Sequence, residues 1–332
     1  MPAITRRLAL ASVLGLPSLL QPAHAQAPGY PNRPIRLVVP FPPGGSTDTA
    51  ARLIAEYLGQ RLGQSIVVEN RGGAGGVVGT DAVVKSPPDG HTLVFGTVSS
   101  TAINHPLFGS RMPYRADELA GIGLVLSAPN LILVRHDSRF RTLRDLVTFA
   151  KANPGVLNFG TTGPGSSVQM AGALLQLAAG IEVTAIPYRG GAQVLQELLA
   201  GRVDFIVDSI PSAITLIQDG QLRVLAVTDL VRASVLPDAP TTTEEGFPDV
   251  QSTAWFGLLA PAQTPRPIIE RLGRDLAAVL EEPGVQARFA SLGGGPLPLP
   301  GGRTTPAAFD AFIAAEIAKW SGVVERTGVT AN

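Results

Sequence analysis

The stretch from Val38 to Asp48 reads Val-Val-Pro-Phe-Pro-Pro-Gly-Gly-Ser-Thr-Asp. Its apolar residues predict a strand, and the prolines and glycines that follow predict a tight turn into a helix. A helix that begins in this way presents unpaired backbone N–H groups and the positive end of its dipole. The stretch is therefore a candidate anion site. A plain turn without a ligand is the alternative, and the choice depends on whether other loops repeat the pattern.

Three later loops do repeat it, each between a predicted strand and a predicted helix. They span residues 70–76, 160–167 and 187–191 and are rich in glycine, with hydroxyl residues in the second. Glycine lets a backbone approach a ligand closely, and Ser and Thr side chains add donors. Such loops meet at the carboxyl ends of parallel strands, where ligands bind in α/β sheets. Together the four loops predict a cleft for a small carboxylate.

Short apolar runs alternate with helical patterns from Ile35 to Thr228, which is typical of α/β folds built on parallel sheets. Polar, proline-containing segments at Ser127–Asn130 and Leu236–Pro240 interrupt the pattern. We interpret them as crossings between two lobes, each a mainly parallel sheet flanked by helices. Residues 30–127 plus 238–332 would form lobe 1, and residues 128–237 would form lobe 2 with the two crossings. Two crossings of this kind predict a hinged cleft.

The N-terminal residues 1–25 have the composition of a secretory signal peptide. Arg6 and Arg7 precede an apolar stretch from Leu8 to Leu20, and Ala23-His24-Ala25 has the form of a cleavage site. The apolar stretch is too short for a membrane anchor. We therefore expect cleavage near Ala25 and a periplasmic protein. The two arginines leave both general secretion and the twin-arginine route open.

Composition excludes several functions. The chain has 26 Lys and Arg against 26 Asp and Glu, so it is a poor candidate for nucleic-acid binding. It has no cysteine, and its four histidines are scattered without metal-ligand spacing. The glycines that begin at Gly73 lack the spacing of a dinucleotide-binding turn. We predict no catalytic residue, metal or cofactor, and a monomer. An exported α/β hydrolase, such as an esterase, is the alternative.

Five ordered motifs carry a resemblance to one family. They are Pro40-Phe41-Pro42-Pro43-Gly44-Gly45 with Asp48, Glu69-Asn70-Arg71 with the glycines 73–76, Gly163-x-Gly165-Ser166-Ser167, Pro187-Tyr188-Arg189-Gly190, and Leu236-Pro237-Asp238 ahead of Trp255-Phe256-Gly257-Leu258. The chain resembles, from Tyr30 to its C-terminal helix, the Bug/TctC family of extracytoplasmic solute-binding proteins of tripartite tricarboxylate transporters.

The resemblance implies a two-lobed "Venus flytrap" that closes on a carboxylate and passes it to a tripartite tricarboxylate-type permease or to a sensor. It leaves the ligand open among dicarboxylates, tricarboxylates, amino acids and aromatic acids. It also implies the ligand-binding residues: Phe41, Pro43, Gly44, Gly45 and Asp48 of lobe 1, and Thr161, Gly163, Ser166, Ser167, Tyr188, Arg189, Gly190 and Asp208 of lobe 2.

Several of these residues also have an interpretation without a ligand. Asp48 suits the first turn of any helix, and Asp208 could simply cap the helix that follows it. Tyr188 could be a half-buried core aromatic and Arg189 a surface charge. Two departures from the family pattern bear on the ligand: Gln169-Met170 replaces a frequent His-Leu, and Gly72 replaces a frequent proline.

Overall fold

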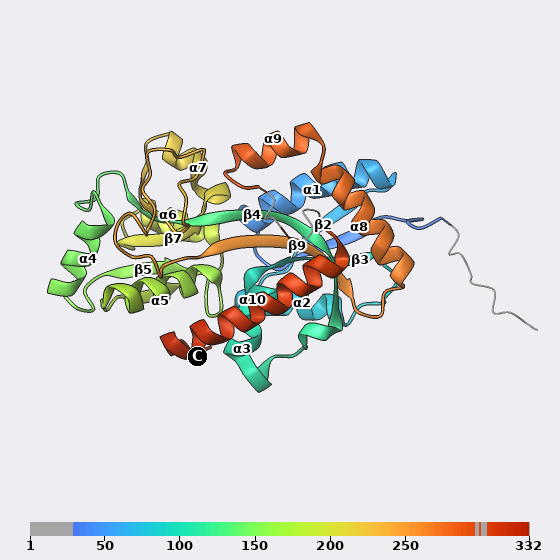
Figure 1. Cartoon of the computed structure of the whole chain (residues 1–332), viewed down its shortest axis with the longest axis horizontal. Coiled ribbons are helices and arrows are strands. Elements are labelled where there is room, and N and C mark those ends of the chain that lie inside the picture. The colour runs from blue at the N-terminus through green and yellow to red at the C-terminus, as the bar shows by residue number, and fades with distance from the viewer. Residues whose placement is uncertain (1–28, 296–298, 300–303, 332) are drawn as a thin grey trace, which may run out of the picture.

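The computed structural model describes residues 29–295, 299 and 304–331, and it shows two α/β lobes side by side (Figure 1). The predicted signal peptide, residues 1–25, lies outside the described residues. Two long strands, β4 (Leu119–Arg135) and β9 (Thr253–Pro261), run together from one lobe towards the other. Within the described part of the chain, no helix has the length and apolar character needed to cross a membrane.

The first lobe is built on the strand order β2-β1-β3-β9-β4. Strands β1, β2 and β3 are parallel, whereas β9 is antiparallel to both of its neighbours. Apolar side chains on both faces of this sheet form two clusters with the helices that cover it. The elements not yet defined are β1 (Ile35–Val39), β2 (Ile66–Asn70), β3 (Thr92–Thr97), α1 (Ser46–Leu62), α2 (Val77–Val84), α3 (Asn104–Phe108), α8 (Arg266–Leu280), α9 (Pro283–Ser291) and α10 (Pro306–Thr327).

The second lobe uses the far half of β4, which pairs with β7 and β8, and continues through β5 to β6. Strands β5, β6 and β7 are parallel, as the alternating pattern predicts. The remaining elements are β5 (Asn158–Thr161), β6 (Thr184–Pro187), β7 (Phe205–Ser209), β8 (Leu222–Val227), α4 (Leu143–Ala152), α5 (Ser167–Ala179), α6 (Gly191–Leu199) and α7 (Ile210–Gln218).

The first crossing is an unbroken strand, so the prediction of two strands separated by a loop at Ser127–Asn130 is wrong. Pro129 lies opposite Thr253 in the β4–β9 ladder. Asn130 then donates its N–H to the Ser252 carbonyl at 3.1 Å and accepts from the Thr228 N–H at 2.9 Å. These partners satisfy both backbone groups of Asn130, the residue directly after the proline, and the chain stays extended there.

Contacts of the segment after Pro237 indicate that the chain returns to the first lobe later than the sequence predicts. The Thr242 N–H donates to the Val227 carbonyl of β8 at 2.8 Å, and Val250 belongs to an apolar cluster of the second lobe. These contacts favour a return crossing near Ser252. We keep the division into two lobes as a proposal, with the segment 238–252 assigned to lobe 2.

Helix α10 lies along the first lobe and reaches the second (Figure 1). Buried Glu316 on this helix accepts the indole N–H of Trp255 at 2.9 Å and that of Trp320 at 3.1 Å. Met170 and Leu174 of α5 belong to the same apolar cluster as these two tryptophans. Helix α10 therefore contacts the start of β9 and packs against both lobes.

Candidate functional site

Loops from both lobes enclose a chamber of about 60 Å³ between them, which we call the inner chamber. The loops follow β1, β3, β5, β6 and β7, and the two long strands contribute its remaining wall. Its lining residues are Phe41, Pro42, Gly45, Ser46, Thr47, Thr97, Val98, Ser99, Asn130, Thr162, Ser167, Val168, Gly191, Asp208, Ser209, Ala254 and Phe256. The predicted cleft is therefore a small, mostly uncharged space.

Three helices begin at the inner chamber without a side-chain cap. Their N-cap residues are Gly45 for α1, Gly190 for α6 and Ser209 for α7. The first N–H groups of a helix have no intrahelical partner, and the helix dipole favours negative charge there. Helix α5 also begins here, but its N-cap Ser166 accepts from the Gln169 N–H at 3.3 Å. The converging helix starts suit an anionic group such as a carboxylate.

Asp208 and Asn130 place acceptor oxygens at the same chamber. Asp208 Oδ1 accepts the Ser209 N–H at 2.7 Å, whereas its buried Oδ2 has no partner. Asn130 Nδ2 donates to Ser252 Oγ at 2.8 Å, and its buried Oδ1 is likewise unpartnered. Burial raises the pKa of Asp208 to about 6, partly offset by the Ser212 hydroxyl and the Ser209 N–H.

We expect Asp208→Asn to stabilise the ligand-free protein by about 3 kcal/mol at neutral pH. An acid whose pKa is raised on folding binds more protons in the folded state, so its burial lowers stability as pH rises from 3.8 to about 6. The advantage of the variant should therefore grow across that window and stay constant above it. Urea unfolding of both proteins from about pH 4.5 to about pH 7.5 measures this. An advantage that does not change with pH would contradict it.

Both carboxylate oxygens of Asp48 accept hydrogen bonds from other groups of the protein. One oxygen accepts from the Gly44 N–H at 3.1 Å and from Arg52 Nε at 3.0 Å, and the other accepts from Asn70 Nδ2 at 2.9 Å. Asn70 also donates to the Phe41 carbonyl at 3.0 Å. The pKa of Asp48 is lowered, because these donors outweigh its desolvation. Asp48 thus holds the turn between β1 and α1 in shape.

A second, wider space of about 680 Å³ opens beside the inner chamber, and we call it the outer chamber. Phe41, Pro42 and Thr162 line both spaces. The walls of the outer chamber are otherwise mainly glycine and proline, with Tyr188 and Arg189 from the loop before α6. Desolvation, with the nearby Glu197 carboxylate, raises the pKa of Tyr188. A ligand too long for the inner chamber could extend into this space.

The two lobes touch around both chambers. The Ser167 N–H of lobe 2 donates to Ser99 Oγ of lobe 1 at 2.9 Å. A Cβ on Gly190 would lie 3.1 Å from the Pro42 ring, and one on Gly75 would lie 2.6 Å from the Pro164 carbonyl oxygen. These glycines allow backbones of opposite lobes to approach. The structure is therefore that of a closed cleft.

The structure brings eight of the thirteen predicted ligand-binding residues to the chambers. Phe41, Gly45, Ser167 and Asp208 line the inner chamber, and Phe41, Pro43, Gly163, Tyr188 and Arg189 line the outer one. The other five support the loops without lining either space: Gly44, Asp48, Thr161, Ser166 and Gly190. Of these, Thr161 Oγ1 accepts from the Gly163 N–H at 3.3 Å. Ligand contact by the lining residues stays a prediction.

Sequence reasoning missed the contributions of Thr97, Ser99 and Asn130. The segment Thr97-Val98-Ser99-Ser100 follows a strand and carries hydroxyl residues, like the third predicted loop. It lacks glycine and proline, and it continues into a π-helical turn, Ser99–Ile103. That composition gave no turn signal. Asn130 was assigned to a hinge loop, whereas it belongs to a strand that lines the chamber.

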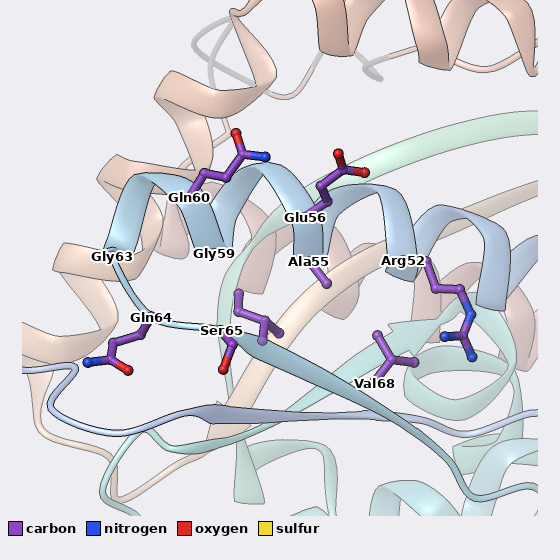
Figure 2. A pocket seen from close by; sticks show the side chains of 10 residues that line it. Arg52, Ala55, Glu56, Gly59, Gln60, Gly63, Gln64, Ser65 and Val68 are labelled. Atoms are coloured by element: carbon purple, nitrogen blue, oxygen red, sulfur yellow. The ribbon is translucent and has the colours of Figure 1, made fainter.

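Outside the cleft, a groove of about 660 Å³ runs between α1 and strand β2 at the edge of the sheet (Figure 2). Figure 2 shows the Glu56 and Gln60 side chains pointing away from the strand. None of the buried, unpartnered polar atoms found in the described residues belongs to this groove. Among those residues, no group of three or more His, Asp or Glu side chains could hold a metal ion. The interlobe chambers are therefore the stronger candidate site.

Comparison with known proteins agrees with this architecture. Residues 50–329 match the model of the tripartite tricarboxylate transporter family receptor, TctC. Protein BugT of Bordetella pertussis is 37% identical over 308 residues, which cover 92% of this chain and 93% of BugT.

Three solved structures superpose over most of the chain. The periplasmic binding protein BugD is 32% identical, with a TM-score of 0.83 over 91% of this chain and 99% of that chain. MatC of Rhodopseudomonas palustris with bound malate is 33% identical, with a TM-score of 0.84 over 89% and 100%. Rpa4515 of R. palustris with adipate is 33% identical, with a TM-score of 0.86 over 91% and 99%.

Proposed function

This chain belongs to the TctC family of tripartite tricarboxylate transporter receptors, and on that premise we propose that it captures a small carboxylate in its interlobe chambers and delivers it to a membrane permease or a sensor. Members of the family are solute-binding proteins and not enzymes, so the hydrolase alternative is set aside. The observation that carries the proposal is the convergence of three uncapped helix starts on one closed chamber.

The chemistry of the inner chamber supports a carboxylate held by neutral donors. Uncapped N–H groups and hydroxyl residues from both lobes line it, and none of its described lining residues is cationic. A carboxylate needs several donors in fixed directions, and each lobe supplies only part of them. Closure is then favoured because contacts on both sides of the ligand exist only in the closed form.

We also propose that the protein acts in the periplasm after removal of residues 1–25. The predicted signal sequence motivates this, and the solved relative BugD is a periplasmic binding protein. Malate and adipate are the ligands of two similar structures, so a small carboxylate is the class of ligand to test first.

A thermal-shift screen of the mature protein against dicarboxylates, tricarboxylates, amino acids and aromatic acids tests the proposal. A ligand at about 100 times its dissociation constant stabilises the folded state by about 2.7 kcal/mol, so at least one carboxylate should raise the melting temperature clearly. The matched amide or ester of that compound should have no effect. A screen in which every carboxylate leaves the melting temperature unchanged would count against carboxylate binding.

A further inference from the structure

The inner chamber is lined by an acidic side chain, Asp208, and the binding of an anion does not explain why an acid lies there. Asp208 is 7% exposed and lies at the end of β7. Its Oδ2 has no hydrogen-bond partner among the described residues. The nearby Ser212 hydroxyl lowers the pKa of Asp208, but its hydrogen bond goes to the Ser209 carbonyl at 2.8 Å. A buried carboxylate without a full set of partners is costly. Such a group in a binding chamber implies a donor on the ligand.

The ionisable groups on the surrounding elements do not supply that donor. Among the described residues that line the inner chamber, Asp208 is the only ionisable one. Helices α5 and α7 and strand β9 carry none, and His105 of α3 lines a different cavity. The others are engaged or distant: Asp48 bonds Arg52 and Asn70, Glu197 of α6 pairs with Arg202, and Arg135 of β4 pairs with Asp137. Arg189 lines only the outer chamber.

A plain dicarboxylate therefore fits the inner chamber poorly. It would bring negative charge next to the buried Asp208 carboxylate without bringing a proton or a cation, and like charges in a low dielectric repel. An ammonium group beside the ligand carboxylate removes the conflict. The carboxylate would accept from the helix starts, while the ammonium would donate to Asp208 Oδ2.

Both acceptors belong to residues that line the chamber, but the pairing of β4 with β7 sets Asn130 opposite Ser209 and Leu131 opposite Asp208, so the Asn130 and Asp208 side chains leave the sheet on opposite faces. Asp208 Oδ2 is therefore the acceptor to which the ligand's donor is assigned. The chamber of about 60 Å³ suits a head group of few atoms. It is joined to the outer chamber through the shared residues Phe41, Pro42 and Thr162, which leaves room for a side chain.

Resting on the proposed function, we propose that the carboxylate ligand is an α-amino acid whose ammonium group binds Asp208. The head group occupies the inner chamber, and the side chain extends past Phe41 into the outer chamber. An α-hydroxy acid offers only a neutral donor to the same oxygen and binds less tightly.

Calorimetry with ligands that differ only at the α position tests this: L-aspartate, L-malate and succinate, then L-glutamate and glutarate. We expect each amino acid to bind at least tenfold more tightly than its unsubstituted partner, with malate in between. In Asp208→Asn, which keeps the shape of the side chain, the amino acids should lose at least tenfold in affinity while succinate and glutarate keep theirs or gain. Equal affinity across each series in the wild-type protein, or tighter binding of malate than of aspartate, would overturn the assignment of an ammonium site.

The pH dependence separates the ammonium from a second arrangement, in which protonated Asp208 donates to the ligand carboxylate. Because burial raises the pKa of Asp208 to about 6, lowering the pH from about 7.5 to about 5.5 should weaken amino-acid binding about fourfold. Binding of succinate that strengthens over this range, together with no preference for aspartate, would establish the second arrangement and overturn the first. Failure of every carboxylate to bind would remove the proposed function itself, whereas tight binding of succinate and glutarate without the amino-acid preference would overturn only this inference.

Discussion

Gly45→Val should lower ligand affinity at least a thousandfold, about 4.1 kcal/mol, while leaving the protein folded. Gly45 lines the inner chamber, and a Cβ built on it meets no atom within 4 Å. The new side chain therefore points into free space, and that space is the chamber of about 60 Å³ that the ligand head group needs. Its φ of −88° and ψ of 174° are accessible to every residue, so the backbone is not strained.

The series Gly45→Ala and Gly45→Val provides the control. Alanine and valine are both weaker N-cap residues than glycine, so the two variants share any effect on α1. They differ in the volume that they add, and affinity should fall with that volume. Calorimetry gives the affinity, and circular dichroism verifies the fold. Wild-type affinity in a folded Gly45→Val protein would mean that the turn does not contact the ligand.

The second large effect on ligand affinity is expected from a bulky side chain placed between the lobes at Gly190. Gly190 has an extended backbone, with φ −174° and ψ 167°, so other residues are tolerated locally. A Cβ there would lie 3.1 to 3.3 Å from three atoms of the Pro42 ring on the opposite lobe. Gly190→Phe should therefore hold the lobes apart and weaken binding about a hundredfold, about 2.7 kcal/mol. Gly190 itself lines neither chamber, so the loss would arise from impaired closure.

Small-angle scattering with and without ligand measures that effect. The wild-type protein should become more compact with ligand, and Gly190→Phe should respond less. Val156→Phe is the matched control, because it adds a ring to a 61% exposed site of lobe 2 that lines neither chamber. A Gly190→Phe protein that compacts and binds like Val156→Phe would argue for a site that does not require closure.

Much of the fold could be predicted from local patterns. The sequence predicts strands at Ile35–Val39 and Leu222–Val227 and a helix at Leu143–Ala152, and β1, β8 and α4 have these bounds, because apolar runs and capping residues mark them directly. Strand β9 was missed: its residues read as one apolar run after a proline-rich segment, and its strand state depends on distant partners in β3 and β4. Helix α9 was also missed, since only its buried Val285 and Phe289 mark an apolar face.

The loops that line the chambers could be predicted wherever a glycine turn follows a strand. Gly45, Gly163 and the loop at Tyr188 lie at the chambers for that reason. The pattern could not distinguish residues that face the cleft from those that support it. Asp48 and Ser166 have the composition of contact residues, yet both bond their own backbone or neighbouring side chains. That difference depends on side-chain direction, which loop composition does not encode.

The central claim is that this protein binds one small carboxylate between its lobes without converting it. Isothermal titration calorimetry with the best ligand of the screen tests this most directly, because binding gives a discrete pulse of heat and turnover gives a continuous one. The account predicts one site per chain, a negative heat-capacity change from closure over apolar surface, and a return to baseline after every injection. A steady heat flow at saturation, with a product in the recovered solution, would contradict it.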